Sequence, residues 1–272
     1  MKLNLHIEVP GSDHFLAADT LLCLADSDML GYILYNQKQK KIYCWKFWEI
    51  ENDVDVKTII EQEFRSVPDS FRIALLNYTP RFIAIPSNIS ASNKNYNFWE
   101  LNMAYQAQEK IIENSSCHKD ICFMHGINRN IYDQMNHRFS DNNWLPIQAI
   151  HFMNPIQKAE KIPIQLIFLY KNVHVNVYQN SQIVLSQAYP LLNPEDTLWQ
   201  LLNIIHNLGL TTEHTELHVE GLIDTHSTIF SLLDQYFERN PLPELTYQFP
   251  ISDIEISHPT LVHIDRILSC VS

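Results

Sequence analysis

The same order of strand and helix signals occurs twice along the chain, once in each half. In the first half, three apolar or aromatic runs are followed by a helical pattern and a further strand. The second half begins the same series near Ile164. The turn at Tyr35-Asn36-Gln37 has its counterpart 143 positions later, at Tyr178-Gln179-Asn180. A period of this length indicates duplicated domains and not the short units of a solenoid. The sequence therefore predicts two α/β lobes that share one topology.

Alternating apolar and polar residues predict the strands of this series, and apolar residues at helical spacing predict its helices. The helix of the first half is expected from Asp53 to Phe64, and that of the second half from Pro194 to Ile205, with Gly209 just past its end. Elsewhere in the first half, the spacing predicts helices over Phe98–Glu113 and Ile131–Phe139. The expected strands are Leu21–Ala25, Gly31–Tyr35, Ile42–Trp48, Phe71–Asn77, Phe82–Pro86, Ile121–Met124, Ile164–Tyr170, Val173–Tyr178, Ile183–Tyr189 and Glu216–Val219.

Two prolines mark the boundary between the lobes. Pro155 and Pro163 bracket the charged segment Lys158–Lys161, and Ile147–Pro163 is interpreted as the joining stretch. We expect residues 1–160 to form the first lobe and residues 161–272 the second. A last helix, Leu261–Cys270, is expected in the second lobe, with packing back onto the first lobe as an alternative.

Several segments resemble one known family. They are Phe71–Pro86, Val173–Tyr178, Asn193–Leu198 and His206–Leu210, and the resemblance extends over essentially the whole chain. The chain is similar to an uncharacterised bacterial family, a domain of unknown function with an actin-like ATPase fold. This resemblance implies the α/β class with two duplicated ribonuclease-H-like (βββαβα) lobes. It implies no catalytic residue, because the family carries no established activity. Relatives by fold, the actin-like pilus-assembly and divisome proteins, act largely through protein contacts.

Glycine content bears on whether this fold binds a nucleotide here, because backbone amides reach phosphates closely only where glycine stands. The chain has five glycines among 272 residues. In the first hairpin Asp26 or Asp28 could hold a hydrated Mg²⁺, but the single Gly31 lies late. The second hairpin, Tyr170–Val173, has neither aspartate nor glycine, and Gly221 stands alone where the fold usually has two. These four residues, Asp26, Asp28, Gly31 and Gly221, are the predicted cofactor contacts only if a nucleotide binds. A plain tight turn at the first hairpin is the alternative.

Charge and missing motifs disfavour other functions. Lys and Arg number 19 against 31 Asp and Glu, so the net charge is −12, which argues against a general binder of nucleic-acid backbones. The chain contains no G-x-G-x-x-G, P-loop or G-x-S-x-G sequence. No stretch reaches the roughly 20 apolar residues that span a bilayer. No signal peptide is recognised, and the five cysteines are an odd number. We expect a soluble, cytoplasmic protein that neither binds nucleic acid nor inserts into a membrane.

Two groups of residues were considered as metal sites. Cys117-His118 with Cys122 gives a C-H-x-x-x-C string, and four histidines lie close together in the second half. Structural zinc usually takes two closely spaced ligand pairs, which neither group supplies. We therefore expect no metal at these places. The four histidines are His206, His214, His218 and His226.

The sequence favours a non-catalytic actin-like binding or scaffold protein with a degenerate nucleotide site and an unidentified protein partner. On this interpretation we expect no cofactor beyond residual Mg-ATP binding. An enzyme is the less favoured interpretation, as a weak Mg-ATP-dependent ATPase or a phosphotransferase of the sugar-kinase-like type. Aromatic residues of strand Ile42–Trp48 are expected in the core, with Trp48 as a candidate for a partner surface. The oligomeric state does not follow from the sequence.

Overall fold

The computed structural model describes residues 2–9, 13–51, 53–87, 95–118, 120–140, 143–156, 160–250 and 256–271. The chain divides into two compact units. The first comprises Met1–Met153, Tyr247–Ile254 and Val271–Ser272, and the second comprises Asn154–Thr246 and Glu255–Cys270. In the described residues, no helix is long and apolar enough to cross a membrane.

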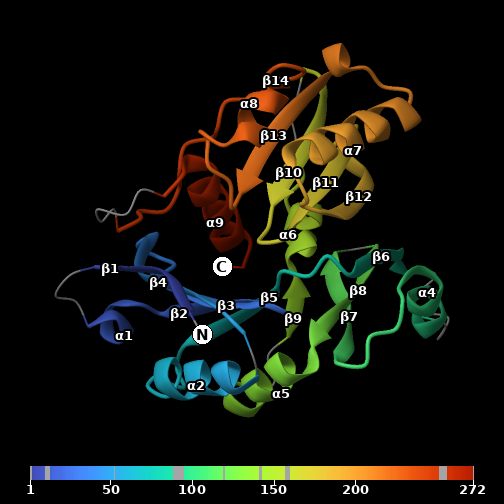
Figure 1. Cartoon of the computed structure of the whole chain (residues 1–272). Helices are drawn as coiled ribbons and strands as arrows, with labels where there is room; N and C mark the ends of the chain where they lie inside the picture. Colours follow the sequence, from blue (N-terminus) through green and yellow to red (C-terminus); the bar gives the residue numbers. More distant parts are fainter. Residues whose placement is uncertain are drawn as a thin grey trace. The chain divides into compact units, whose positions relative to one another are not determined.

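A six-stranded sheet with the order β1-β4-β3-β2-β5-β9 forms the centre of the first unit (Figure 1). Strands β2, β3 and β4 make an antiparallel meander, and β5 and β9 join parallel to β2. Parallel neighbours need a crossover connection, which the helix α2 (Asp53–Glu63) provides between β4 and β5. The strands are β1 (Lys2–Glu8), β2 (Thr20–Asp26), β3 (Met29–Asn36), β4 (Lys41–Glu49), β5 (Arg72–Asn77) and β9 (Trp144–Pro146).

Two helices cover one face of this sheet. Helix α2 lies beside α5 (Arg129–Arg138) in Figure 1, and the apolar residues of both pack into one core with alternate residues of the strands. Phe64, directly after α2, is fully buried and makes an edge contact with the ring of Tyr32 at a centroid distance of 5.4 Å. A short helix, α1 (His14–Ala17), precedes β2 and is capped by Asp13, whose Oδ1 accepts from the N–H of Phe15.

A second, three-stranded antiparallel sheet belongs to the same unit, with the order β6-β8-β7. A buried polar group connects it to the larger sheet. Asn77 at the end of β5 donates to Nδ1 of His125 (2.9 Å), and the opposite ring nitrogen of His125 lies 3.1 Å from Oδ1 of Asn114. The elements of this part are β6 (Phe82–Pro86), α4 (Asn95–Asn102), β7 (Glu109–His118), β8 (Ile121–Asn128) and α6 (Ile147–Met153).

The second unit repeats the topology of the larger sheet. Its five strands run in the order β12-β11-β10-β13-β14, which corresponds to β4-β3-β2-β5-β9 of the first unit. The strands β10, β11 and β12 form the meander, and β13 and β14 follow parallel to β10. The elements are β10 (Ile162–Phe168), β11 (Asn172–Gln179), β12 (Gln182–Pro190), α7 (Pro194–Asn207), η1 (Thr212–His214), β13 (Thr215–Gly221), α8 (Thr228–Leu233), β14 (Glu238–Arg239) and α9 (His258–Val271).

Local sequence explains the turns and caps of this unit. Asn180 and Ser181 between β11 and β12 both have positive φ angles (52° and 61°), as a two-residue hairpin turn requires. Asn193 caps α7, because its Oδ1 accepts from the N–H of Asp196 at 2.7 Å and Pro194 fills the first helical position. Gly209 follows the helix with a φ of 68°.

A buried polar network lies in the second unit, where α9 contacts the sheet. Glu220 of β13 accepts from Arg266 of α9 (2.9 Å) and from Gln165 of β10 (3.1 Å). Gln165 in turn accepts from the hydroxyl of Tyr178 (2.7 Å). The negative charge of Glu220 raises the pKa of Arg266. These bonds satisfy polar groups that burial would otherwise leave costly.

Some expectations from the sequence are wrong. The predicted helix Phe98–Glu113 is interrupted, since α4 ends at Asn102 and Glu109 begins strand β7. The pairing of β7 with β8 overrides the helical spacing. The expected joining stretch begins with helix α6, which buries residues such as Ala149 and Ile150. Trp48 is 4% exposed and packs against Tyr32, so it offers no partner surface.

Two of the fully buried histidines, His125 in the first unit and His174 in the second, make stability depend on pH. Burial lowers the pKa of His125 to about 4 and that of His174 to about 3. In the unfolded chain both titrate near 6.5, so between that pH and the folded values the unfolded state binds more protons. Their contribution to stability is complete above about pH 6.5 and is lost as the pH falls. We expect the free energy of unfolding to drop by roughly 2 kcal/mol per buried histidine between about pH 7.5 and pH 5.

Thermal unfolding at these two pH values measures this effect. The His125→Gln variant is expected to unfold at lower temperature at pH 7.5 but to show a smaller further loss at pH 5. The exposed His206 supplies the control, and His206→Gln should keep the full pH dependence. An unchanged pH dependence in His125→Gln would contradict the assignment of a neutral, buried His125.

Candidate functional site

A polar pocket of about 250 Å³ lies in the first unit at the carboxyl ends of β2 and β5. Asp26 and Asn77 are the last residues of these two strands, and both line the pocket. The smaller sheet contributes Glu109 from the start of β7 and Asn128 from the end of β8. Carboxyl ends of parallel strands are the usual place for ligands in open α/β sheets.

The pair Arg81 and Glu109 dominates the electrostatics of the pocket. The guanidinium holds the carboxylate in two parallel bonds, Nε to Oε1 at 2.7 Å and Nη2 to Oε2 at 2.9 Å. Nη2 also lies 2.5 Å from the carbonyl oxygen of Ala104, and the guanidinium carbon lies 5.6 Å from the ring centroid of Trp99. Such a two-pronged pair has a defined geometry and leaves little positive charge for a further anion.

Gly126 allows the carboxylate of Glu109 to occupy its position. A Cβ atom at this glycine would lie 1.7 Å from Oε1 of Glu109, so any side chain there would displace it. Among the described residues that line the pocket, Arg81 is the single cation, against the two carboxylates of Asp26 and Glu109. The pocket therefore suits a neutral polar or cationic group better than a phosphate chain.

The predicted nucleotide contacts lie in different surroundings. Asp26 lines the pocket, and its Oδ1 accepts from the N–H of Ser27 at 2.7 Å. Asp28 is in the turn between β2 and β3, where its carbonyl oxygen accepts from the N–H of Ile50. Neither Asp28 nor Gly31 lines the pocket.

Sheet packing accounts for the two predicted glycines without any ligand. Gly31 stands inside β3, and a Cβ atom there would lie 2.9 Å from the carbonyl oxygen of Lys46. Gly221 ends β13 in the second unit with a φ of 101°, and its Cβ would lie 2.2 Å from the carbonyl oxygen of Phe168. Both positions thus need glycine because another strand passes close by.

The sequence reasoning missed the residues that define the pocket. Asn77 was visible as the last residue of a predicted strand, and Arg81 lies in a segment that carries the family resemblance. Glu109 gives no such signal, because the helical spacing predicts a helix over Phe98–Glu113, and Asn128 lies beyond the predicted strand Ile121–Met124. Only the pairing of β7 with β8 places Glu109 opposite Asn128 and beside Gly126.

Three of the candidate metal ligands, His214, His218 and Cys122, have other partners. His214 bonds to Thr211 (2.8 Å), and His218 bonds to Glu216 (2.9 Å). Cys122 is buried and its Sγ lies 3.4 Å from Oε1 of Glu113. The side chains of Cys117 and His118 lie outside the described part of the structure.

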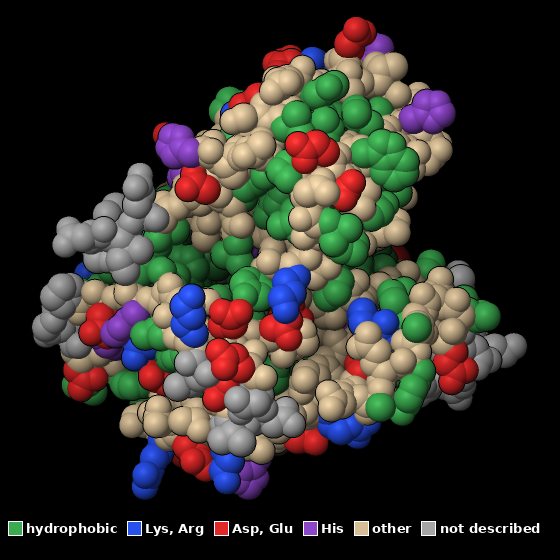
Figure 2. All heavy atoms as spheres, in the orientation of Figure 1, with side chains coloured by type: hydrophobic (Ala, Val, Ile, Leu, Met, Phe, Trp, Pro, Cys, Tyr) green, Lys and Arg blue, Asp and Glu red, His purple; other side chains and the backbone are tan. Residues whose placement is uncertain are grey.

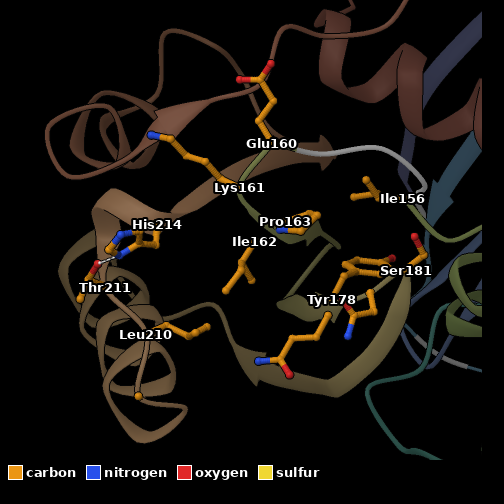
Figure 3. A pocket seen from close by; sticks show the side chains of 13 residues that line it. Ile156, Glu160, Lys161, Ile162, Pro163, Tyr178, Ser181, Leu210, Thr211 and His214 are labelled. Atoms are coloured by element: carbon orange, nitrogen blue, oxygen red, sulfur yellow. Dashed lines mark hydrogen bonds between the residues drawn. The ribbon is translucent and has the colours of Figure 1, made fainter.

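A larger, open pocket of about 610 Å³ occurs in the second unit (Figure 3). It lies at the start of β10, the opposite end from the one where ligands usually bind. Ile162, Pro163 and Leu210 form apolar parts of its wall. The ammonium of Lys161 at its rim is paired with Glu238 at 2.6 Å. We prefer the polar pocket of the first unit, because it lies at the carboxyl ends of parallel strands.

Exposed apolar side chains stand next to the polar pocket along the chain. Leu101 is 81% exposed and Tyr105 is 88% exposed, directly before Gln106 and Gln108, which line the pocket. Hydrophobic side chains are visible at the surface on this side of the first unit, over α4 (Figure 2). Large apolar side chains at such exposure are typical of sites that contact another protein.

Comparison with known proteins identifies the family of the chain. A family model matches residues 14–239, which is most of the sequence. The chain belongs to the family "Protein of unknown function (DUF3822)". A comparison with curated proteins finds no match.

Solved structures that are similar to this member of DUF3822 show its fold. One is a protein of unknown function with an actin-like ATPase fold from Bacteroides thetaiotaomicron. It has a TM-score of 0.75 and 15% identity, and the match covers 95% of this chain and 99% of that chain. Another is a PilM–PilN type IV pilus biogenesis complex, with a TM-score of 0.57 and 8% identity over 93% of this chain and 99% of that chain. The expected actin-like ATPase fold is therefore confirmed, as is its α/β class.

Loss of the Glu109 charge should destabilise the first unit. Glu109→Gln keeps the size of the side chain but leaves the guanidinium of Arg81 without its ionic partner in a largely buried position. We expect a loss of about 1–3 kcal/mol in unfolding free energy, the range for hydrogen bonds to charged groups. Thermal unfolding measures it.

Glu61 provides the matched control for this change. It pairs with Lys57 at 3.7 Å on the exposed face of α2, and both side chains are more than half exposed. Glu61→Gln should cost less than about 0.5 kcal/mol. If both substitutions lowered the unfolding free energy equally, the pair of Arg81 and Glu109 would contribute no more to stability than an exposed ion pair.

Proposed function

We propose that this protein is a binding module with an actin-like fold that does not hydrolyse nucleotide, and that the polar pocket of its first unit receives part of a protein partner. The arrangement of Arg81 and Glu109 carries this proposal. A triphosphate needs cations or glycine-rich backbone around it. Here the cation of the pocket is already held by a carboxylate at 2.7 and 2.9 Å.

The surroundings of the pocket favour a protein as the ligand. Gln106 and Gln108 offer amide groups at its rim, and exposed Leu101 and Tyr105 add apolar surface beside them. A combination of apolar anchors with a polar recess is typical of protein interfaces. One of the similar solved structures is itself a complex of two proteins, the PilM–PilN complex. The identity of the partner of this chain is open.

We place this activity in the cytoplasm. Cys23, Cys44, Cys122 and Cys270 are not joined in disulfides, and the first three are buried. Free thiols are usual in a reducing compartment. The net charge of −12 supports a protein partner over nucleic acid.

The second candidate function is a weak Mg-ATP-dependent ATPase or phosphotransferase. One observation favours it, because Asp26 stands beside Asn77 at the carboxyl ends of β2 and β5, where this class of sheet binds ligands. A carboxylate at this position could hold hydrated Mg²⁺. The glycines that phosphates require are, however, engaged in sheet packing.

Thermal unfolding with and without Mg-ATP separates the two functions. A ligand present at 100 times its Kd stabilises a protein by about 2.7 kcal/mol, which shifts Tm by several degrees. We expect no shift at millimolar Mg-ATP and no ATP turnover above background. A clear shift or turnover that disappears in Asp26→Ala would support the enzyme and contradict the binding module.

Paired variants test whether the surface beside the pocket binds a protein. We expect Leu101→Ser with Tyr105→Ser to lose a partner that the wild-type chain retains after crosslinking in its own cells, while Tm stays within a few degrees. Leu192→Ser with Tyr236→Ser is the control, since these residues are also exposed but belong to the second unit. The proposed surface would be contradicted if the Leu101→Ser, Tyr105→Ser variant kept every partner. It would also be contradicted if only the control variant lost a partner.

A further inference from the structure

A group of potential metal ligands occurs at the edge of the larger sheet of the first unit, away from the pocket. Glu8 of β1 is directly opposite Cys44 of β4 in the strand register. His6 lies two residues before Glu8, so its side chain projects from the same face of the strand. His14 of α1 reaches the same place, and its Nε2 lies 3.3 Å from Oε2 of Glu8.

The ligand atoms of His6, Glu8 and Cys44 lie close together. Nε2 of His6 lies 3.0 Å from Oε2 of Glu8. The ligand atoms of His6, Glu8 and Cys44 all lie within 4.8 Å of one another. Zinc binds nitrogen, oxygen and sulfur at about 2.0–2.3 Å in a tetrahedron, which separates its ligand atoms by roughly 3.3–3.8 Å. The ligand atoms of His6, Glu8 and Cys44 are near that spacing, and His14, which contacts Glu8, is the candidate for a fourth ligand.

We propose that His6, Glu8, His14 and Cys44 form a binding site for a divalent transition metal ion, for which zinc is the best fit. Imidazole, thiolate and carboxylate are the ligand types that zinc takes in proteins, and four protein ligands make a closed, structural site. The proposal is independent of the function assigned to the pocket.

The surroundings are compatible with an ion. His6 and Glu8 side chains are 39% and 45% exposed, so an ion can enter from solvent, while Cys44 is buried beneath them. The thiol of Cys44 lies 3.8 Å from the hydroxyl oxygen of Tyr32.

One cation lies on the same face. Lys46 is opposite His6 in the register, and its ammonium is paired with Glu63 of α2 at 3.0 Å. The carboxylate of Glu63 offsets this charge. With the thiolate and Glu8 as ligands, two negative charges would remain to balance a divalent ion.

Such a site would stabilise a weak part of the fold. β1 is an edge strand with largely exposed side chains, and α1 has four residues. A metal would connect both to β4 by coordinate bonds. These coordinate bonds would limit fraying of the edge strand and its pairing with another chain.

Cobalt titration of the whole chain, after removal of metal with a chelator, tests the site. Cobalt(II) takes zinc positions and absorbs in the near ultraviolet when a thiolate is bound to it. We expect one equivalent to bind with this band and with strong visible absorption of tetrahedral type, and zinc to displace it. We also expect zinc to raise Tm by a few degrees.

Variants assign the band to residues. Cys44→Ser should abolish it, whereas Cys122→Ser, the control at another buried cysteine beside a carboxylate, should retain it. Because Cys44→Ser changes the core, His6→Ala and Glu8→Gln at exposed positions provide a second test. Each should weaken cobalt affinity at least tenfold, an effect that even partners of metal ligands produce.

Three results would overturn the site. They are the lack of a thiolate band with one equivalent of cobalt, a band lost in Cys122→Ser but retained in Cys44→Ser, and unchanged affinity in both His6→Ala and Glu8→Gln.

Discussion

The parallel pairing of β2 with β5 organises the first unit, and that of β10 with β13 organises the second. Parallel neighbours cannot be joined by a tight turn, so a helix must connect the preceding strand to each of them. α2 and α7 are these connections, and their apolar faces supply much of the two cores. The same pairing brings the carboxyl ends of two strands to one edge, where the chain can present polar groups without disturbing the core.

Several buried or partly buried charged groups of this fold are paired with an opposite charge. In the pocket Arg81 forms a hydrogen-bonded ion pair with Glu109, and in the second unit Arg266 forms one with Glu220. His125 and His174 avoid the cost of a buried charge by staying neutral, as the lowered pKa values show. A site that must bind phosphate keeps positive groups or backbone amides unpaired for its ligand. The cation of this pocket, Arg81, is instead paired with Glu109, and this pairing supports the proposed binding function.

Some of the fold and a smaller part of the site could be predicted from the sequence. The repeated order of elements, the hairpin at Asn180 and the cap of α7 follow from local patterns, and the structure has them all. The predicted residue Asp26 lines the pocket, whereas Gly31 and Gly221 lie where another strand passes close by. Arg81 and Glu109 were missed because their meaning arises from pairing with each other across 28 positions.

The sequence by itself determined the elements whose signal is local, since alternation, helical spacing and capping act over a few neighbouring residues. It determined the duplicated topology for the same reason, because the pattern is present twice. Only the tertiary structure decided which distant side chains meet, such as Glu8 with Cys44 or Asn77 with His125. Strand register decides those meetings, and register depends on the packing of the whole sheet. The functional conclusions therefore rest on contacts that no local pattern contains.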